Sequence, residues 1–241
     1  MTSNRDEHIT RANAVYPAFY DFGDKQLVFP KESLKGGTWF ISNQMGDIGI
    51  LLNGAFEKHV SSPPYRQSRG WILPEIFQKE SPLRALKQYD LTGIENFTII
   101  LWYQKQLWEI KWNGTLMYMV KLNPKTSHIW SSVTLYTPQM IAERKQWFDQ
   151  LFQSGKIWDQ QDILDFHTRT HLSNKAYGLQ INRENQIRTV STTSLSLDKQ
   201  RANLVHMDLI QGIDTNLSYD IPFYTNLTFR ANPEIQYEQS N

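Results

Sequence analysis

The sequence of 241 residues contains no cysteine. Disulfide bonds, thiolate nucleophiles and cysteine metal sites are therefore excluded for the chain as given. Neither sign of charge dominates, because 25 Lys and Arg residues oppose 24 Asp and Glu residues and leave a formal net charge of +1. Without a strong field to attract polyanions, we expect no nucleic-acid partner. No apolar run approaches the roughly 18 residues that a membrane helix needs, so we expect a cytoplasmic protein without a membrane span.

Aromatic residues are the compositional excess of this chain, at 13% with 8 Trp. A hydrophobic content of 40% and a charged content of 20% fit a folded globule. The length suits one large domain, and no repeat or linker-like stretch divides it. We therefore predict a single domain over residues 1–241.

Strand-like and helix-like segments occur in groups along the chain. Hydrophobic patterning and turn signals predict strands at 26–30, 38–42, 48–52, 97–105, 107–114, 116–124, 187–198 and 202–210, followed by an irregular tail from residue 213. Helical patterns occupy 69–79, 81–89, 137–155 and 159–172. Strands and helices that alternate in groups predict an α+β layered domain instead of βαβ units.

Four short motifs follow one another in the first third of the chain. They are Asn4-Arg5-Asp6-Glu7, Gly36-Gly37-Thr38-Trp39, Leu52-Asn53-Gly54 and Tyr65-Arg66-x-Ser68-Arg69-Gly70. In this order and at these intervals they resemble the NRDE family, whose animal members are called transport and Golgi organisation proteins. The later stretches "HIWSSVTLYTP" and "RTVSTTSLSL" are similar to the bacterial branch of that family.

The resemblance implies an Ntn-hydrolase-like fold, a four-layer αββα sandwich of two antiparallel sheets. It also implies a mature chain that begins with a nucleophilic Cys on a first strand, with its own amine as the base. This sequence starts just before the motif at Asn4, so we expect that the first strand and the nucleophile are missing. Thr2 is a less favoured alternative nucleophile, because the resemblance places it at the end of the second strand. We therefore expect no hydrolytic activity from the chain as given.

Three residues are catalytic candidates by this resemblance: Arg5, Asp6 and Asn53. An Arg beside a carboxylate can orient a thiolate or a substrate carbonyl through charge-assisted hydrogen bonds. It can equally form an ordinary surface ion pair. Asn53 resembles the Asn that related amidases use as an oxyanion donor, and it also fits a turn residue before a glycine.

Two further groups of residues are weaker candidates. Tyr65, Arg66 and Arg69 are candidates for binding an acidic group of a substrate, or they cap and solvate a helix start. His167 and His171 have a spacing that can hold a metal on one helix face, but no third ligand is evident and a solvated helix end is the better interpretation. We predict no metal site and no cofactor.

Two functions are compatible with these observations. The first is hydrolysis of a linear amide by an enzyme in which the candidate residues support an absent Cys. The alternative is a non-enzymatic binding or trafficking protein for a hydrophobic ligand such as haem or an acyl group. The tryptophan-rich strands between residues 97 and 130 favour a flat apolar ligand, although core packing explains them as well. We expect a small-molecule or acyl-amide ligand as partner, and the sequence does not define the oligomeric state.

Overall fold

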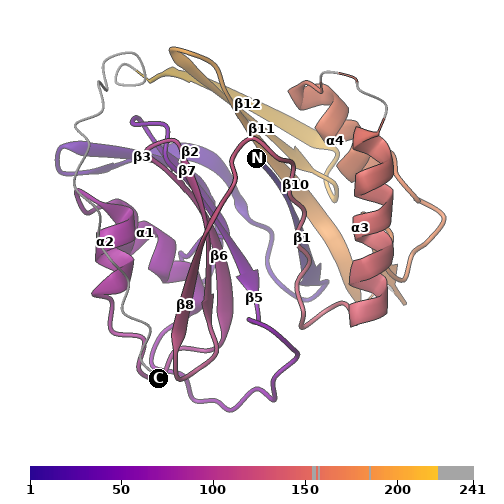
Figure 1. Ribbon diagram of the computed structural model, residues 1–241, viewed down its shortest axis with the longest axis horizontal. Coiled ribbons are helices and arrows are strands. Elements are labelled where there is room, and N and C mark those ends of the chain that lie inside the picture. Colours follow the sequence, from indigo (N-terminus) through magenta and orange to yellow (C-terminus); the bar gives the residue numbers. More distant parts are fainter. Residues whose placement is uncertain (154–155, 157, 185, 222–241) are drawn as a thin grey trace.

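Two antiparallel β-sheets pack face to face in the computed structural model of the chain, which describes residues 1–153, 156, 158–184 and 186–221. Helices lie on the outer side of each sheet, so that four layers succeed one another across Figure 1. Residue 1 pairs with Leu195 of the smaller sheet through two backbone hydrogen bonds, so the start of the chain extends this sheet. The predicted α+β class and four-layer sandwich are confirmed by this arrangement.

The larger sheet is a seven-stranded meander in which each strand pairs with its neighbours in sequence. Its strands are β2 (Val15–Phe22), β3 (Lys25–Lys31), β4 (Phe40–Asn43), β5 (Ile48–Asn53), β6 (Phe97–Tyr103), β7 (Gln106–Trp112) and β8 (Met117–Leu122). Both faces of this sheet are covered, which explains why the first five residues of β6 are all apolar or Thr and all buried. Short turns join β6, β7 and β8, so an uninterrupted sheet forms from local pairings.

The smaller sheet joins the two ends of the described chain. It contains β1 (Thr2–His8), β9 (Asn182–Arg183), β10 (Ile187–Leu197), β11 (Arg201–Asp208) and β12 (Ile213–Asp220). The strand order is β1-β10-β11-β12, with β9 paired to the start of β10. β1 therefore has β10 as its partner on one side and ends the strand order on the other. A register shift between Arg5 and Asp6 interrupts the pairing of β1 with β10.

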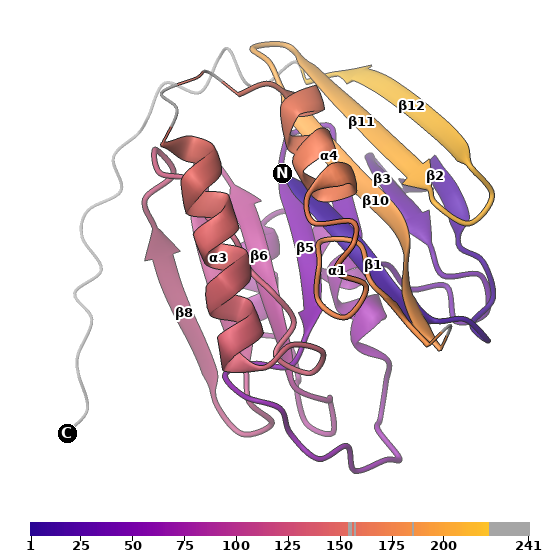
Figure 2. The ribbon, with the colours of Figure 1, turned by 90° about the vertical axis from the view of Figure 1, so that its right-hand side faces the viewer.

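Five helical segments in the described part of the chain complete the layers. A 3-10 turn η1 (Arg69–Trp71), α1 (Ile72–Phe77) and α2 (Pro82–Lys87) pack against the seven-stranded sheet, and α3 (Pro138–Phe152) and α4 (Gln160–Arg169) lie on the opposite side of the molecule. Thr137 caps α3 by accepting a hydrogen bond from the Met140 amide, with Pro138 in the first turn as predicted. Figure 2 shows α4 in front of β10, which it contacts. None of the helices in the described ranges is long and apolar enough to cross a bilayer.

Apolar side chains form separate cores on the two faces of the larger sheet. The outer core joins this sheet to α1 and α2 through fully buried residues such as Phe77, Leu86 and Phe97. The inner core joins the two sheets through Phe40, Ile100 and, from the smaller sheet, the residues Leu195, Ala202 and Leu204. Burial of these side chains is the main stabilising contribution to the sandwich.

Three expectations about local structure are wrong. Residues 213–220 form the regular edge strand β12 and not an irregular tail, while residues 222–241 lie outside the described part. Strand β2 was not predicted, because Pro17 interrupts its pattern. Helix α4 ends at Arg169, so His171 lies in the following turn with a positive φ of 51°. The predicted end of the other long helix, at residues 154 and 155, lies outside the described residues.

Candidate functional site

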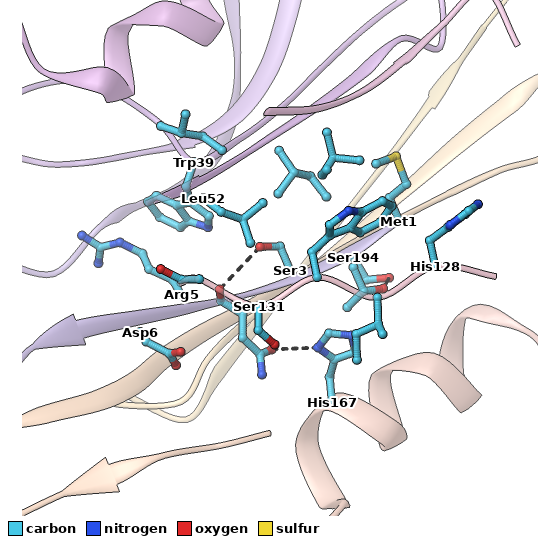
Figure 3. A pocket seen from close by; sticks show the side chains of 18 of the residues that line it. Met1, Ser3, Arg5, Asp6, Trp39, Leu52, His128, Ser131, His167 and Ser194 are labelled. Atoms are coloured by element: carbon cyan, nitrogen blue, oxygen red, sulfur yellow. Dashed lines mark hydrogen bonds between the residues drawn. The ribbon is translucent and has the colours of Figure 1, made fainter. Parts of the chain in front are cut away.

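A cavity of about 660 Å³ lies beside β1, between the inner face of the larger sheet and helices α3 and α4. The whole of the motif at residues 4–7 lines it, together with residues 126–132 from the segment that precedes α3. Figure 3 shows Arg5, Asp6, Ser131 and His167 grouped around this space, with Trp39 and Leu52 across from His167. The cavity therefore brings together residues 1–7, several segments from the middle of the chain and residues 194–196 of β10.

The larger sheet contributes an apolar wall to this cavity, which the Trp130 side chain extends. The wall consists of Trp39, Ile50, Leu52, Ile100, Trp102, Leu107 and Trp130. The Trp130 indole donates a hydrogen bond to Glu109 at 3.2 Å, which fixes the ring at the border of the cavity. Large, rigid aromatic faces of this kind offer apolar contact area at a small cost in side-chain entropy.

Arg5 is held by two neighbours at one end of the cavity. Its guanidinium forms an ion pair with Glu7 at 3.1 Å and lies over the Trp39 ring at 4.5 Å from the ring centroid. Burial lowers the pKa of Arg5 from its usual range, and the charge of Glu7 opposes this effect. Arg5 is therefore a fixed cation whose charge is already neutralised by Glu7. Its guanidinium also holds the Trp39 ring in place through a cation–π contact.

Asp6 uses both carboxylate oxygens within the protein. Oδ2 accepts the phenolic hydrogen of Tyr136 at 2.5 Å, and Oδ1 accepts the hydroxyl hydrogen of Thr189 at 2.6 Å. Burial and the neighbouring carboxylate raise the pKa of Tyr136 far above its ordinary value, so the phenol remains a donor. Asp6 lies in the cavity lining, and its firmest observed role is to connect β1 with the segment before α3 and with β10.

Asn53 lies at the end of β5, where it borders the same cavity. Its backbone carbonyl accepts a hydrogen bond from Ser132 at 2.9 Å. The next residue, Gly54, has a φ of 82°, and a Cβ there would lie 2.6 Å from Val133. The turn therefore requires glycine. The Asn53 side chain is exposed and has no hydrogen bond to another described residue, so its amide remains available to a ligand.

The three candidates for substrate binding separate in space. Arg69 lines the cavity, where it forms an ion pair with Glu95 at 2.9 Å and donates to the Asn96 carbonyl at 2.7 Å. Arg66 lies outside the cavity and donates to the carbonyls of residues 90 and 92. The hydroxyl of Tyr65, also outside, accepts a hydrogen bond from the amide of residue 62. Of the three, Arg69 alone is in a position to meet a ligand in this cavity.

His167 faces the cavity and contacts Asn4. The Asn4 amide nitrogen donates to the Leu179 carbonyl at 2.6 Å, so its Oδ1 accepts from Thr192 and from Nδ1 of His167 at 3.2 Å. This assignment leaves Nε2 of His167 as an acceptor. Desolvation, followed by the charges of Arg144 and the N-terminal amine, lowers the pKa of His167 to about 3. The imidazole is therefore neutral near pH 7.

His171 does not join His167. Its ring stacks on Trp147 with 3.9 Å between ring centroids, in the turn that follows α4. Within the described ranges, no cluster of three or more His, Asp or Glu side chains has the geometry to hold a metal ion.

Sequence reasoning missed Arg144 and Tyr136. Arg144 is buried on α3 and lies over the Tyr136 ring at 4.0 Å from the centroid, and both residues line the cavity. A signal was present, since Arg144 follows Met140 and Ile141 and precedes Trp147, and thus occupies a position on the apolar stripe of the helix. An Arg on the buried face of a helix needs a partner that the helix itself does not supply.

Comparisons with known proteins give one family and a set of solved structures. The family model described as Transport and Golgi organisation 2 matches residues 1–209. A mutant of conjugated bile acid hydrolase from Clostridium perfringens superposes with a TM-score of 0.39 at 8% identity, covering 82% of each chain. A second variant of the same enzyme has a TM-score of 0.39 and 8% identity over 85% of each chain. No curated protein sequence matches the chain significantly.

Proposed function

The chain belongs to the Transport and Golgi organisation 2 family, as the order of its NRDE motifs predicts, and from this premise we propose that it binds a hydrophobic small molecule without hydrolysing it. The observation that carries the proposal is the cavity of about 660 Å³ with an apolar wall. Sites for small molecules are concave, mostly apolar and of about 300–1,000 Å³, with a few polar groups that fix orientation. The cytoplasmic location stays a prediction.

The polar side of the cavity supports binding more directly than catalysis. Arg5 is paired with Glu7, and Asp6 accepts hydrogen bonds on both oxygens, so neither presents a free charge to a reacting atom. The chain has no cysteine to act as a nucleophile. Loss of the nucleophile from a catalytic unit removes on the order of a million-fold in rate.

Calorimetric titration of the purified protein with 1-decanol, haem and an acyl-CoA tests the proposal. We expect saturable binding of at least one of these ligands, and we expect Leu52→Trp to weaken it at least ten-fold by filling the cavity. Val120→Trp is the matched control, because Val120 is exposed on β8 and outside the cavity lining. Absence of binding by all three ligands, or equal weakening by both variants, contradicts the proposal.

Hydrolysis of a linear amide is the second candidate function, in which Arg5, Asp6 and Asn53 have supporting roles. It is favoured by the Asn53 amide, which has no described hydrogen-bond partner and borders a cavity that the other two residues also line. An amide N–H placed there suits a negative charge that develops on a carbonyl oxygen. A panel of acyl amides, assayed with a protein extended at its N-terminus by a strand that begins with Cys, and with the same protein carrying Cys→Ala or Asn53→Leu, tests this alternative. Turnover that each substitution reduces at least a hundred-fold supports it, and equal rates in all three proteins reject it.

A further inference from the structure

Arg144 is a buried cation at the edge of the cavity. The residue is 6% exposed and projects from α3 into the cavity lining. One guanidinium nitrogen, Nη1, donates to the Ser131 hydroxyl at 3.1 Å, and the face of the guanidinium lies over Tyr136. Both of these partners are neutral groups.

Two other arginines that line the cavity, the buried Arg5 and the half-buried Arg69, have carboxylate partners. Arg5 is 3.1 Å from Glu7, and Arg69 is 2.9 Å from Glu95. Over the described ranges, no carboxylate oxygen lies within 4.0 Å of the Arg144 guanidinium, and its Nε atom is buried without a hydrogen-bond partner. Burial of a charge costs several kcal/mol unless a counter-charge and hydrogen bonds compensate for it. Among the described residues, the Arg144 guanidinium therefore lacks both a counter-charge and a hydrogen-bond acceptor for its Nε atom.

The neighbouring acidic group is not available to complete it. Asp6 lies at the hydroxyl end of Tyr136, while Arg144 lies over the ring of the same residue. Both oxygens of Asp6 already accept hydrogen bonds from Tyr136 and Thr189. A rotation of Asp6 toward Arg144 would leave two hydroxyls without their acceptor. A ligand anion in the cavity would neutralise Arg144 without breaking these two hydrogen bonds of Asp6.

Ser131 provides a second donor for an incoming anion. Its Oγ accepts the hydrogen bond from Arg144, so its own hydroxyl hydrogen can point toward a ligand. Ser131 lines the cavity, and Figure 3 shows it between Arg5 and His167. An anion placed here would meet one cation and one hydroxyl donor. That set matches a singly charged, planar carboxylate better than a phosphate dianion, which needs more positive charge.

We infer that Arg144 and Ser131 bind the carboxylate of an amphipathic acid whose apolar body lies against Trp39, Leu52 and Trp130. This inference rests on the proposed binding function and adds the class of ligand. The apolar wall and Arg144 line the same cavity, so a single ligand can contact both. A ligand with an apolar body and a terminal carboxylate would fill the cavity and supply the missing counter-charge.

Paired ligands that differ only in the terminal group test the inference. Decanoate and 1-decanol are titrated at pH 7.5 by calorimetry, below the concentrations at which they aggregate. The carboxylate of decanoate can form a charge-assisted hydrogen bond with Arg144, which is stronger than a bond to a neutral hydroxyl. We therefore expect decanoate to bind at least ten-fold more tightly than 1-decanol. Arg144→Met should abolish this preference while binding of 1-decanol stays within three-fold of wild type. Arg144→Lys should retain part of the preference.

Lys145→Met is the matched control, because it removes the same charge from the next residue of α3, whose side chain is exposed. It should keep the preference of the wild-type protein. Urea unfolding without ligand distinguishes a ligand site from a structural role, since Arg144→Met should not lower the stability of the ligand-free protein. A preference for decanoate that survives Arg144→Met overturns the inference, as does an equal affinity of the wild type for both ligands. Failure of both decanoate and 1-decanol to bind also overturns the inference, while the proposed function is contradicted only if haem and the acyl-CoA fail to bind as well.

Discussion

Tyr136 donates its phenolic hydrogen to Asp6 at 2.5 Å and joins two segments that are 130 residues apart. The same ring contacts two guanidinium groups, with Arg144 at 4.0 Å and Arg183 at 5.2 Å from the ring centroid. Tyr136 thus contacts both the Asp6 carboxylate on β1 and the Arg144 guanidinium on α3. The polar side of the cavity is organised around this residue.

Tyr136→Phe should lower the free energy of unfolding by about 1–3 kcal/mol, because it leaves one oxygen of Asp6 without a donor in a largely dry environment. Urea denaturation followed by circular dichroism measures the change. Tyr118→Phe, which removes the hydroxyl of an exposed tyrosine on β8, serves as the control and should have an effect below about 0.5 kcal/mol. Equal effects of the two variants would show that the bond to Asp6 contributes nothing.

Acidification should destabilise the protein through two histidines. Burial lowers the pKa of His206, which is 1% exposed, to about 4, and the pKa of His167 falls to about 3. Between the unfolded value of about 6.5 and these folded values, the unfolded chain binds more protons, so stability falls as the pH falls. Each histidine contributes a slope of up to about 1.4 kcal/mol per pH unit in that window.

Urea denaturation between pH 7.5 and 5.0 measures this dependence. His206→Gln should reduce the slope by about 1 kcal/mol per pH unit, since glutamine does not titrate and can still bond to Thr193, the partner of His206 at 2.8 Å. His8→Gln is the control, because His8 is exposed on β1. An unchanged slope in His206→Gln would mean that this histidine is protonated in the folded protein.

Gly37 and Gly70 allow two backbone segments to touch beside the cavity. A Cβ on Gly37 would lie 2.7 Å from the carbonyl carbon of Gly70, and the adjacent amide of Thr38 donates to the Gly70 carbonyl at 2.9 Å. Gly37→Ala should therefore destabilise the protein by about 3 kcal/mol, since rigid backbone and not a flexible side chain opposes the methyl group.

Gly23→Ala serves as the reference for this effect. Gly23 has a φ of 67°, and apart from this residue and its two chain neighbours no atom of the described residues lies within 4 Å of the place that a Cβ would occupy. Its replacement should cost about 1 kcal/mol from backbone conformation alone. Thermal unfolding of the two variants compares the costs. If Gly37→Ala costs no more than Gly23→Ala, the contact with Gly70 can open without penalty.

Gln160 attaches α4 to the smaller sheet through bonds to two strands. Its Nε2 donates to the carbonyls of Ser194 and Asn203 at 3.2 and 3.0 Å, and its Oε1 accepts from Ser196 and from the Asn203 amide. Gln160→Ala should cost about 2–3 kcal/mol by leaving several of these groups unsatisfied. Gln161→Ala on the exposed face should cost less than about 0.5 kcal/mol, and chemical denaturation of both variants makes the comparison.

The strands with strong patterns were predictable, and those with weak patterns were not. The mostly apolar run at residues 97–105 predicts a strand, and the structure confirms a strand there, β6, whose first five residues are buried. β12 has mostly exposed residues, and its sequence IDTNLSYD contains few apolar side chains. Its regularity comes from pairing with β11, a tertiary interaction that a local pattern does not reveal.

The site was predictable only in part for a similar reason. The motif series indicated that Arg5, Asp6 and Asn53 belong together, and all three line one cavity, although their roles stay predictions. The sequence did not reveal that Asp6 is satisfied by Tyr136 and Thr189, because those partners come from distant segments. Arg144 was missed although it lies on the apolar stripe of its helix, because an Arg on a helix usually extends its charge to solvent.

Strand β10 has a further consequence for the chemistry that the interior can accommodate. Thr189, Ser191, Thr192, Thr193 and Ser194 are all buried on this central strand. A hydroxyl group turns by rotation about one bond and offers either a hydrogen or a lone pair. The middle of the smaller sheet is therefore a row of buried hydroxyl groups, each of which can donate or accept as its neighbours require. Two of these hydroxyls already donate to side chains of the cavity lining, Thr189 to Asp6 and Thr192 to Asn4, so the orientation of the motif at residues 4–7 is set from inside the sheet.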